Sequence, residues 1–247
     1  MAIKQAKIIT VTSVKGGTGK TFTALALAGI LSNKKIKTII VDMDLHAGVI
    51  NASLNLNATK DIYTLVNDYV NHSLKDLEEY ITKYNDYIDV LPAPKDPRSV
   101  GKINAYYIDL ILKKLKYQYD VILIDTNHII DDINLITLDN SDSAIYVITS
   151  DLMCLKNMKT MLAIYKDMGL KNYHLLLNEA LKKEQDVYSV SSFLGAGINY
   201  ILPSNYFIKN YSKLIMKGQI VTLQKQYQKE KGTLILTELL DEILKEE

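Results

Sequence analysis

The stretch Ser13–Thr21, with the sequence SVKGGTGKT, follows a short apolar run, Lys7–Thr12, and precedes a segment with helical spacing. Its glycines let backbone N–H groups close around phosphate oxygens, and the positive end of the following helix attracts the same charge. A strand, a glycine-rich loop and a helix in this order predict a phosphate-binding loop. The stretch holds two lysines, Lys15 and Lys20, where an ordinary loop of this kind has one. The role of Lys15 therefore needs an explanation.

Two side chains at the end of this loop have specific predicted roles. Lys20 would reach the β- and γ-phosphates of a nucleotide, and the Thr21 hydroxyl would bind Mg²⁺. The strand–loop–helix context favours this interpretation over a glycine-rich turn with chance lysines. The nucleotide-binding residues that we expect in this segment are Lys15, Gly16, Gly17, Thr18, Gly19, Lys20, Thr21 and Phe22.

Short apolar runs alternate along the chain with longer segments of helical spacing. The runs are Lys7–Thr12, Thr38–Val41, Ile88–Leu91, Val121–Ile124, Ala144–Thr149, Leu175–Leu177 and Ile198–Leu202. Runs that look buried on both faces are typical of parallel strands, and strands alternating with helices form right-handed βαβ units. We therefore predict an α/β fold with a doubly wound, mostly parallel sheet and helices on both faces. An intervening segment, Ser73–Tyr84, is also expected to be helical.

The composition limits the class of protein. The 247 residues are 48% hydrophobic and 23% charged, which predicts one domain over residues 1–247 with a sizeable core. Lys and Arg number 29 against 28 Asp and Glu, so no overall basic field indicates a nucleic acid or membrane partner. The single cysteine, Cys154, excludes an intrachain disulfide, and no apolar run is long enough to span a membrane. We expect a soluble, cytoplasmic protein.

Carboxylates stand at the ends of two predicted strands, where open parallel sheets bind their ligands. Asp42 and Asp44 end the second strand, and alternate strand residues point the same way, so both could face the phosphates. We expect Asp44 to orient or deprotonate the attacking water and Asp42 to support the nucleotide and metal site. Asp125 follows Val121–Ile124 and is the predicted magnesium carboxylate. An acidic pair at a strand end is often only a solvated cap. The position of Asp42 and Asp44 in the second βα turn after the phosphate loop favours a functional role instead.

These pieces, in this order, resemble the deviant Walker A ATPases related to MinD and ParA, whose loop reads KGGxGK[ST] with an early lysine. The matching residues are Lys15, Gly16, Gly17, Gly19, Lys20 and Thr21. The resemblance implies ATP and Mg²⁺ as cofactors and a homodimer that sandwiches ATP between subunits. It also implies that Lys15 crosses to the nucleotide of the second subunit. Arg98 is the only arginine of the chain, so a lysine supplied in trans could take the place of an arginine finger.

Candidates for contact with the base follow two late strands. Guanine-specific relatives have Asn-Lys-x-Asp at this point, whereas residues 178–181 read Asn-Glu-Ala-Leu. The Asn178 amide can match the edge of adenine and resembles the family's adenine-contacting asparagine, so ATP is favoured. The turn at Pro203 and Asn205 resembles the segment that packs beside the base. The alternative interpretation of this turn is an ordinary strand-to-helix loop.

Further motifs resemble the ATPase domain of the CpaE/TadZ group, whose members help to localise pilus-secretion machinery at a cell pole. They are Asp42–Gly48, Val90–Pro97, and Asp125 followed by Asp131 and Asp132. This resemblance implies a slow, ATP-driven dimerisation switch that positions tad/Flp-type pilus assembly, with protein partners from that system. The group's N-terminal receiver-like domain is not expected, because the chain begins at the first strand.

Two residues depart from the family pattern. The family's Asp-Thr-Pro after the magnesium strand ends in Asn127 here, and the second Thr or Ser after the loop is replaced by Phe22. Asn127 with His128 leaves open a third function, a nucleotide-binding scaffold with little turnover.

The second candidate function is a ParA-type positioning ATPase that uses DNA as its track. Lys209, Lys213 and Lys217, spaced four apart, would form a basic stripe on a helix. A solvated helix face is the commoner cause, so DNA binding is possible but not favoured. MinD proper ends in a basic lipid-binding helix, whereas the polar face of residues 233–247 is acidic. Because anionic lipid repels this face, we expect a docked helix and no direct membrane insertion.

Overall fold

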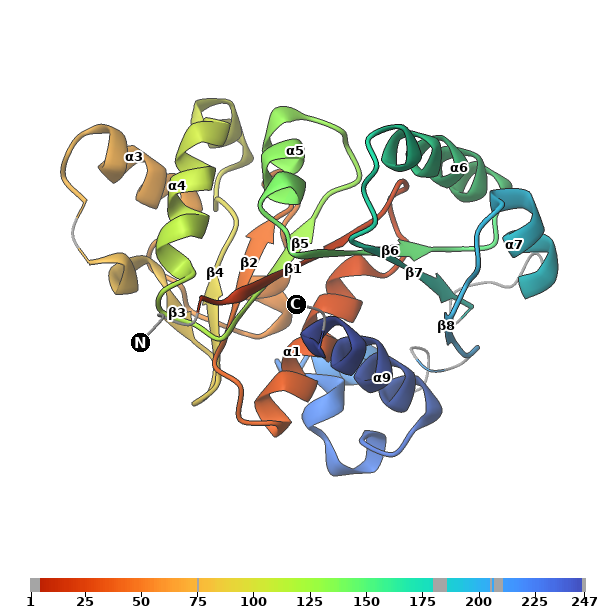
Figure 1. Ribbon diagram of the computed structural model, residues 1–247. Helices are drawn as coiled ribbons and strands as arrows, with labels where there is room; N and C mark the ends of the chain where they lie inside the picture. Colours follow the sequence, from red (N-terminus) through yellow and green to blue (C-terminus); the bar gives the residue numbers. More distant parts are fainter. Residues whose placement is uncertain (1–4, 75, 180–185, 205, 207–210, 246–247) are drawn as a thin grey trace.

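The computed structural model describes residues 5–74, 76–179, 186–204, 206 and 211–245. They form an eight-stranded sheet with the order β3-β4-β2-β5-β1-β6-β7-β8, shown in Figure 1. The strands are β1 Lys7–Thr12, β2 Thr38–Met43, β3 Thr82–Lys83, β4 Ile88–Leu91, β5 Val121–Thr126, β6 Ser143–Ile148, β7 Tyr173–Asn178 and β8 Tyr200–Leu202. Neighbouring strands are parallel except β3 and β4. The predicted doubly wound, mostly parallel α/β fold is confirmed.

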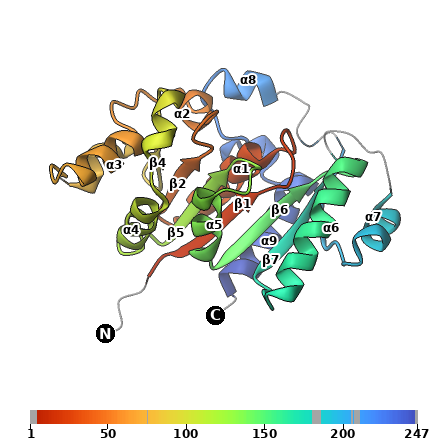
Figure 2. The same cartoon turned by 90° about the horizontal axis from the view of Figure 1, so that it is seen from above.

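Helices cover both faces of this sheet, as Figures 1 and 2 show. They are α1 Lys20–Asn33, α2 Ile50–Ser53, α3 Ile62–Val70, α4 Ala105–Leu115, α5 Asp132–Asp139, α6 Leu152–Asp167, α7 Val187–Leu194, α8 Tyr211–Ile215 and α9 Lys231–Lys245. One face packs against α1 and α9, and the other against α3 and α4 on one half and α6 and α7 on the other half. Strands β1, β2, β5 and β6 are almost wholly buried, because both of their faces are covered.

Each of the seven predicted strands is present, whereas the predicted helix over Ser73–Tyr84 is wrong. Its described residues form a 3₁₀ turn, Leu77–Tyr80, and the short antiparallel strand β3. The Tyr80 hydroxyl donates a 2.6 Å hydrogen bond to Asp68 of α3, which fixes the turn against that helix. Pairing with β4 then holds the following residues extended. These tertiary contacts outweigh the helical spacing of the segment.

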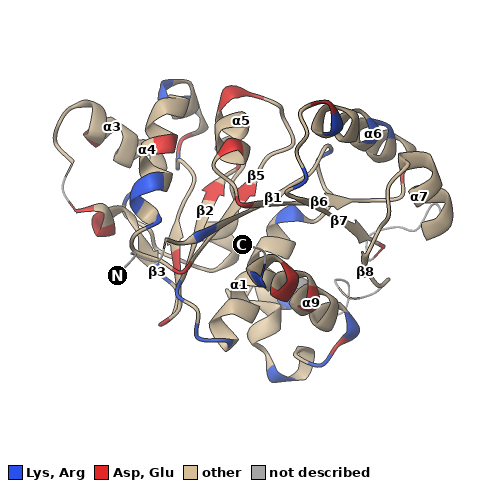
Figure 3. Cartoon of the chain, in the orientation of Figure 1, with Lys and Arg blue, Asp and Glu red and all other residues tan. Residues whose placement is uncertain are grey.

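The order of strands places the functional loops at one edge of the sheet. Strand β1 lies between β5 and β6, and the strand order reverses at this position of the sheet. The loop that follows β1 therefore lies at the topological switch point, where sheets of this kind bind their ligands. Asp42 of β2 lies opposite Asp125 of β5 in the register. Figure 3 shows acidic residues at the ends of both strands. The predicted nucleotide residues of three strands therefore converge at one place.

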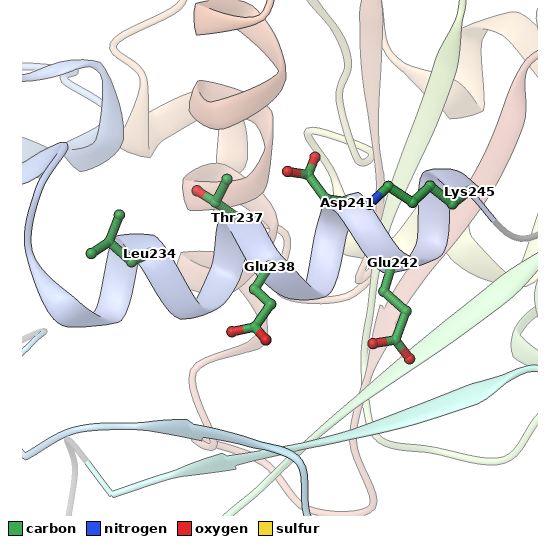
Figure 4. A pocket seen from close by; sticks show the side chains of 6 residues that line it. All are labelled: Leu234, Thr237, Glu238, Asp241, Glu242 and Lys245. Carbon is green, nitrogen blue, oxygen red and sulfur yellow. The ribbon is translucent and has the colours of Figure 1, made fainter.

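The last helix, α9, packs on the sheet as expected. Its apolar residues Leu236, Leu239, Leu240 and Ile243 are fully buried, which confirms the prediction of a docked helix. Figure 4 shows the opposite face, where Glu238, Asp241 and Glu242 line a shallow pocket. Within the described residues, no helix combines the length and the apolar character that crossing a membrane requires.

Candidate nucleotide site

The loop between β1 and α1 has the backbone of a phosphate cradle. Gly17 and Gly19 have φ angles of 74° and 98°, values that favour glycine over residues with a side chain. Gly19 caps the N-terminus of α1, and a Cβ built on it would lie 2.7 Å from the Nδ2 atom of Asn178. The loop is therefore held in a conformation that directs backbone N–H groups and the start of α1 to one point.

Lys20, the first residue of α1, is buried beneath this loop. Its Nζ atom donates a 3.0 Å hydrogen bond to the Ser13 hydroxyl, which in turn donates to the Lys15 carbonyl at 2.5 Å. Burial lowers the pKa of Lys20, while the carboxylates of Asp125 and Asp44 act in the opposite direction. A buried ammonium group between carboxylates and a phosphate-binding loop is suited to neutralising the charge of a bound anion.

Asp42 is buried and holds the turn that follows β2. Its two oxygens accept backbone N–H bonds from Ile50 at 3.1 Å and from Asp44 at 3.3 Å. Burial and the nearby Asp125 carboxylate raise its pKa well above the usual value. Asp44 is partly exposed and accepts a 3.3 Å bond from the Ala47 amide. The two carboxylates thus differ in environment, because Asp42 is buried and supports the turn, whereas Asp44 is partly exposed.

Asp125 has the properties expected of a ligand to a cation. It is fully buried, and its Oδ1 atom has no hydrogen-bond partner among the described residues. Burial, with a contribution from Asp44, raises its pKa to about 7, although a hydrogen bond with the Thr21 side chain and the charge of Lys20 act to lower it. The buried hydroxyl of Thr18 also has no partner in the described chain. Unsatisfied buried oxygens of this kind are costly unless a ligand completes them.

A magnesium nucleotide fits these residues. The described residues contain no cluster of three His, Cys, Asp or Glu side chains that could hold a metal ion alone. Mg²⁺ usually takes one or two protein oxygens and completes its shell with substrate phosphates and water. The Thr21 hydroxyl and the Asp125 carboxylate, which contact each other, offer two such oxygens at the mouth of the phosphate loop.

Lys15 lies at the rim of the loop and is paired within its own chain. Its Nζ atom is 2.8 Å from the Oδ1 atom of Asp151, and the two side chains are 43% and 19% exposed. Asp151 also accepts bonds from the Thr149 hydroxyl and from the Cys154 amide, so it caps α6. Burial alone would raise the pKa of Asp151, but these bonds and Lys15 outweigh it and lower the pKa to about 2. Lys15 is therefore held by a carboxylate that stays ionised at neutral pH.

Of the residues predicted to contact the base, the structure describes Asn178 and Pro203, and it also describes Phe22 of the predicted nucleotide-binding segment. Asn178, at the end of β7, is buried and donates a 2.8 Å hydrogen bond from Nδ2 to the Thr18 carbonyl, so it supports the phosphate loop in the structure. Pro203 follows β8 and is partly exposed, and Asn205 lies outside the described residues. Phe22 is buried and packs edge-on against Tyr206, with ring centroids 6.0 Å apart. Its side chain thus belongs to the core of the α1 face.

Asn127, which replaces the family's proline, organises the loop after β5. Its Oδ1 atom accepts bonds from the Ile129 amide at 2.8 Å and from the Asn134 side chain at 2.6 Å. Asn134 also donates to the Ile129 carbonyl. The replacement therefore leaves a defined turn that is tied to α5, with His128 near Gly16 of the phosphate loop.

Two residues of the site were missed by sequence reasoning, Ser13 and Asp151. Ser13 is the first residue after β1, three positions before Gly16, and its hydroxyl accepts a hydrogen bond from Lys20. Asp151 lies two positions after the predicted strand end at Thr149, whereas Asp42 and Asp125 come immediately after their predicted runs. A search that included the first turn after each strand would have found Asp151.

The predicted DNA-binding stripe is described only in part. Lys213 on α8 and Lys217 just after it are exposed, whereas Lys209 lies outside the described residues. The stripe therefore stays a prediction.

The site and the fold define a phosphate-loop protein of the α/β class. A family model described as an AAA domain matches residues 6–182, and the chain belongs to this family, within the MinD/ParA superfamily. An uncharacterised protein of Methanocaldococcus jannaschii is 34% identical over 128 residues, 48% of this chain and 49% of that protein. The septum site-determining protein MinD of a Synechocystis strain is 27% identical over 70% of this chain and 64% of its own length. The matches thus span about half and just under two thirds of these relatives.

Solved structures share the fold over almost the whole chain. A ParA family ATPase from Chlorobium tepidum has a TM-score of 0.82, with 20% identity and coverage of 98% of this chain and 100% of its own. MinD from Pyrococcus horikoshii, solved with Mg-ADP, has a TM-score of 0.78, with 24% identity and coverage of 97% and 96%. At these identities the similarity establishes the fold.

Proposed function

We propose that this chain is a Mg-ATP-dependent dimerisation switch with slow ATP hydrolysis that positions a cellular machine. The observation that carries the proposal is the placement of two lysines on one phosphate loop. Lys20 is buried among carboxylates, and Lys15 is held at the rim by Asp151. On the CpaE/TadZ-like motifs, we propose tad/Flp-type pilus assembly as the machine. Protein partners of that system would recruit the chain from the cytoplasm to a cell pole.

In this proposal, binding of ATP depends on the loop and Lys20. The backbone N–H groups of residues 16–21 surround the phosphates, and Lys20 neutralises their charge. The Thr21 hydroxyl and the Asp125 carboxylate would hold Mg²⁺, which supplies further charge neutralisation on the β- and γ-phosphates. Asn178 contributes by fixing the loop at Thr18, and its amide can also serve the adenine edge.

The carboxylates have separate tasks in hydrolysis. Asp44, just after β2, is more exposed than Asp42 at the end of that strand, and it orients or deprotonates the attacking water. Asp42 accepts the Asp44 amide and so positions that residue. The only arginine, Arg98, is exposed and pairs with Asp96, so lysines must neutralise the charge that develops on the transferred group. We therefore expect slow turnover.

Lys15 gives the dimer its dependence on ATP. To serve the second subunit, its ammonium group has to leave Asp151 and contact the partner's nucleotide. The pair is partly exposed, so its loss costs little, and a triphosphate is a stronger acceptor than one carboxylate. The same exchange in both subunits makes ATP the bridge between them.

A ParA-type ATPase that uses DNA is the second candidate. A ParA family protein of Chlamydia trachomatis is 29% identical over 130 residues, and Lys213 and Lys217 are exposed. Stimulation of phosphate release by DNA at physiological salt would favour this candidate over the pilus proposal.

The test of the proposed function is phosphate release measured with Mg-ATP for four proteins. Wild type and Asp86→Ala, which removes an exposed carboxylate far from the loop, should release phosphate at the same slow rate. Lys20→Ala should lose ATP binding, because the variant lacks the desolvated cation that neutralises the charge of a bound triphosphate. Asp44→Ala should bind ATP without turnover. Undiminished release by Asp44→Ala would contradict the mechanism, and ATP binding without release by wild type would indicate the scaffold.

A further inference from the structure

A hollow lies between α6 and α7, at the end of the sheet away from the nucleotide site. Figures 1 and 2 show the two helices side by side, and the hollow has a volume of about 460 Å³. Its lining includes Tyr173, the first residue of β7, whereas Asn178, the last residue of that strand, reaches the phosphate loop. A strand of this length spans roughly 20 Å, so this α6–α7 hollow has no part in the chemistry proposed above.

The α6–α7 hollow is positively charged. Among the described residues that line it, the only charged ones are Lys159, Lys166 and Lys171. All three are exposed, and none forms an ion pair with a described residue. The last turn of a helix favours a cation, which accounts for Lys166 at the end of α6. It does not account for Lys159 in the middle of the helix or for Lys171 beyond its end.

One of these cations is held in place within the hollow. The Nζ atom of Lys159 lies 4.9 Å from the centroid of the Phe193 ring of α7. A cation–π contact of this kind directs the ammonium group of one helix toward the other. The positive charge is therefore partly ordered before a ligand arrives, which lowers the cost of binding an anion there.

The rest of the lining is apolar or small. Leu162 is partly buried, Leu194 is buried and Leu170 is 39% exposed. Gly169 and Gly195 follow the last residues of α6 and α7 with φ angles of 69° and 65°. A Cβ built on either glycine would meet no described heavy atom within 4 Å beyond its own neighbours in the chain. The two helix ends therefore leave room for the main chain of a partner to approach closely.

We propose that the α6–α7 hollow docks an acidic segment of a partner protein. The segment would place an apolar side chain against the leucines and its carboxylates beside the lysines. Lys159 and Lys166 are seven positions apart on α6, or roughly 10 Å along the helix, a distance that about three residues of an extended chain cover. The predicted segment thus has two acidic residues about three positions apart, with apolar residues between them. The proposal does not rest on ATP binding or hydrolysis.

Other occupants fit the hollow less well. Nucleic acid binds such lysines mainly through its phosphates, which would leave the leucines uncovered, and a flat bilayer would rest on the rim without entering. A second copy of the chain could offer the acidic face of α9. On that face, however, Asp241 already pairs with Lys34. Glu242 accepts a hydrogen bond from the Tyr200 hydroxyl, so these carboxylates are engaged within their own chain.

The test uses labelled ten-residue peptides added to nucleotide-free protein. The first peptide has the central sequence Glu-Leu-Leu-Glu, and two matched peptides replace either the glutamates by glutamine or the leucines by serine. Fluorescence anisotropy should show saturable binding of the first peptide, with each matched peptide binding about threefold or more weakly. Equal binding of the first peptide and either matched peptide would overturn the proposal.

Variants of the protein locate the binding. Lys159→Glu and Lys171→Glu should each weaken binding of the first peptide by about threefold or more, and the double variant by about tenfold or more. Lys156→Glu is the matched control, because Lys156 is an exposed lysine of α6 outside the lining of the hollow. It should bind as wild type. If the loss of the Phe193 contact lowers the melting temperature of Lys159→Glu, Lys171→Glu decides alone. Undiminished binding by folded Lys171→Glu would overturn the proposal.

The competing occupants are checked with the double variant. Self-association of wild type without nucleotide that the double variant abolishes would assign the hollow to a second copy and overturn the proposal. Tighter binding of a 20-nucleotide DNA than of the first peptide, lost in the same variant, would overturn it in favour of nucleic acid. Binding to vesicles of phosphatidylcholine and phosphatidylserine that the variant abolishes would overturn it in favour of a membrane. None of these results would bear on the proposed ATPase, because the assays lack nucleotide.

Discussion

The ion pair between Lys15 and Asp151 should restrain the dimerisation switch, and Asp151→Asn isolates that effect. Asparagine keeps the size of the side chain and can still cap α6 by accepting the Cys154 amide. It removes the negative charge that holds the Lys15 ammonium group 2.8 Å away. In the proposed mechanism Lys15 has to leave this carboxylate, so the variant should form the ATP-dependent dimer more readily than wild type.

The size of the effect follows from the exposure of the pair. Lys15 is 43% exposed, and ion pairs of this kind contribute about 0.2–1 kcal/mol each. A dimer releases two such pairs, so the gain is about 0.4–2 kcal/mol, or about twofold to thirtyfold in the dimer dissociation constant. Because the pKa of Asp151 is lowered to about 2, the pair is intact throughout the neutral range and the gain should not depend on pH between 6 and 8.

The assay is sedimentation velocity over a range of protein concentrations with Mg²⁺ and a non-hydrolysable ATP analogue. Asp96→Asn is the matched control, because Asp96 also pairs with a basic residue, Arg98, and caps a helical turn away from the site. The control should dimerise as wild type. A dimer of Asp151→Asn that is no tighter than wild type would refute the idea that Asp151 restrains Lys15.

Three further predictions concern the site itself. Asp125→Asn should raise the free energy of unfolding of nucleotide-free protein at pH 8. Burial raises the pKa of Asp125 from 3.8 to about 7, so between these two pH values the native state binds more protons than the unfolded state. The native state therefore loses stability as the pH rises through that range, and the asparagine variant avoids this loss. Urea unfolding at pH 8 and pH 4 checks this, and a stability gain that does not shrink at pH 4 would contradict it. Gly19→Ala should abolish nucleotide binding in calorimetry. The φ angle of 98° at this position and the Asn178 side chain, 2.7 Å from the new Cβ, both disfavour the present loop conformation with alanine. Normal affinity would show that the loop is not a rigid cradle. Asn178→Ala should weaken the binding of ATP more than the binding of inorganic triphosphate. Equal losses of affinity for the two ligands would restrict the role of Asn178 to supporting the loop.

The strands and the phosphate loop were predictable because their signals are local. A strand buried on both faces is a continuous apolar run, so all seven predicted runs became strands. The carboxylates Asp42 and Asp125 follow from the same pattern, since they end such runs, and the sheet register sets them opposite each other. The extent of β2, which reaches Met43, was underestimated because the polar Asp42 interrupts the apolar run.

The misses come from contacts between distant parts of the chain. The segment Ser73–Tyr84 has helical spacing, but a bond from Tyr80 to Asp68 and pairing with β4 override it. Lys15 and Asp151 are 136 positions apart in the sequence, so the pair depends on β1 and β6 lying side by side. Helices α5 and α7 have only eight residues each, too few for a clear helical period, so the sequence did not predict them.

The most direct test of the central claim is the mass in solution with Mg-ATP of wild type, Lys15→Ala and Asp44→Ala. Lys15→Ala should bind ATP and remain a monomer, because Lys20 and the loop backbone are intact while the contact to the second subunit is lost. Asp44→Ala should accumulate as an ATP-bound dimer, since it lacks only the orientation of water. If Lys15→Ala dimerises as readily as Asp44→Ala, Lys15 does not act across the subunits, and the account of the switch is wrong.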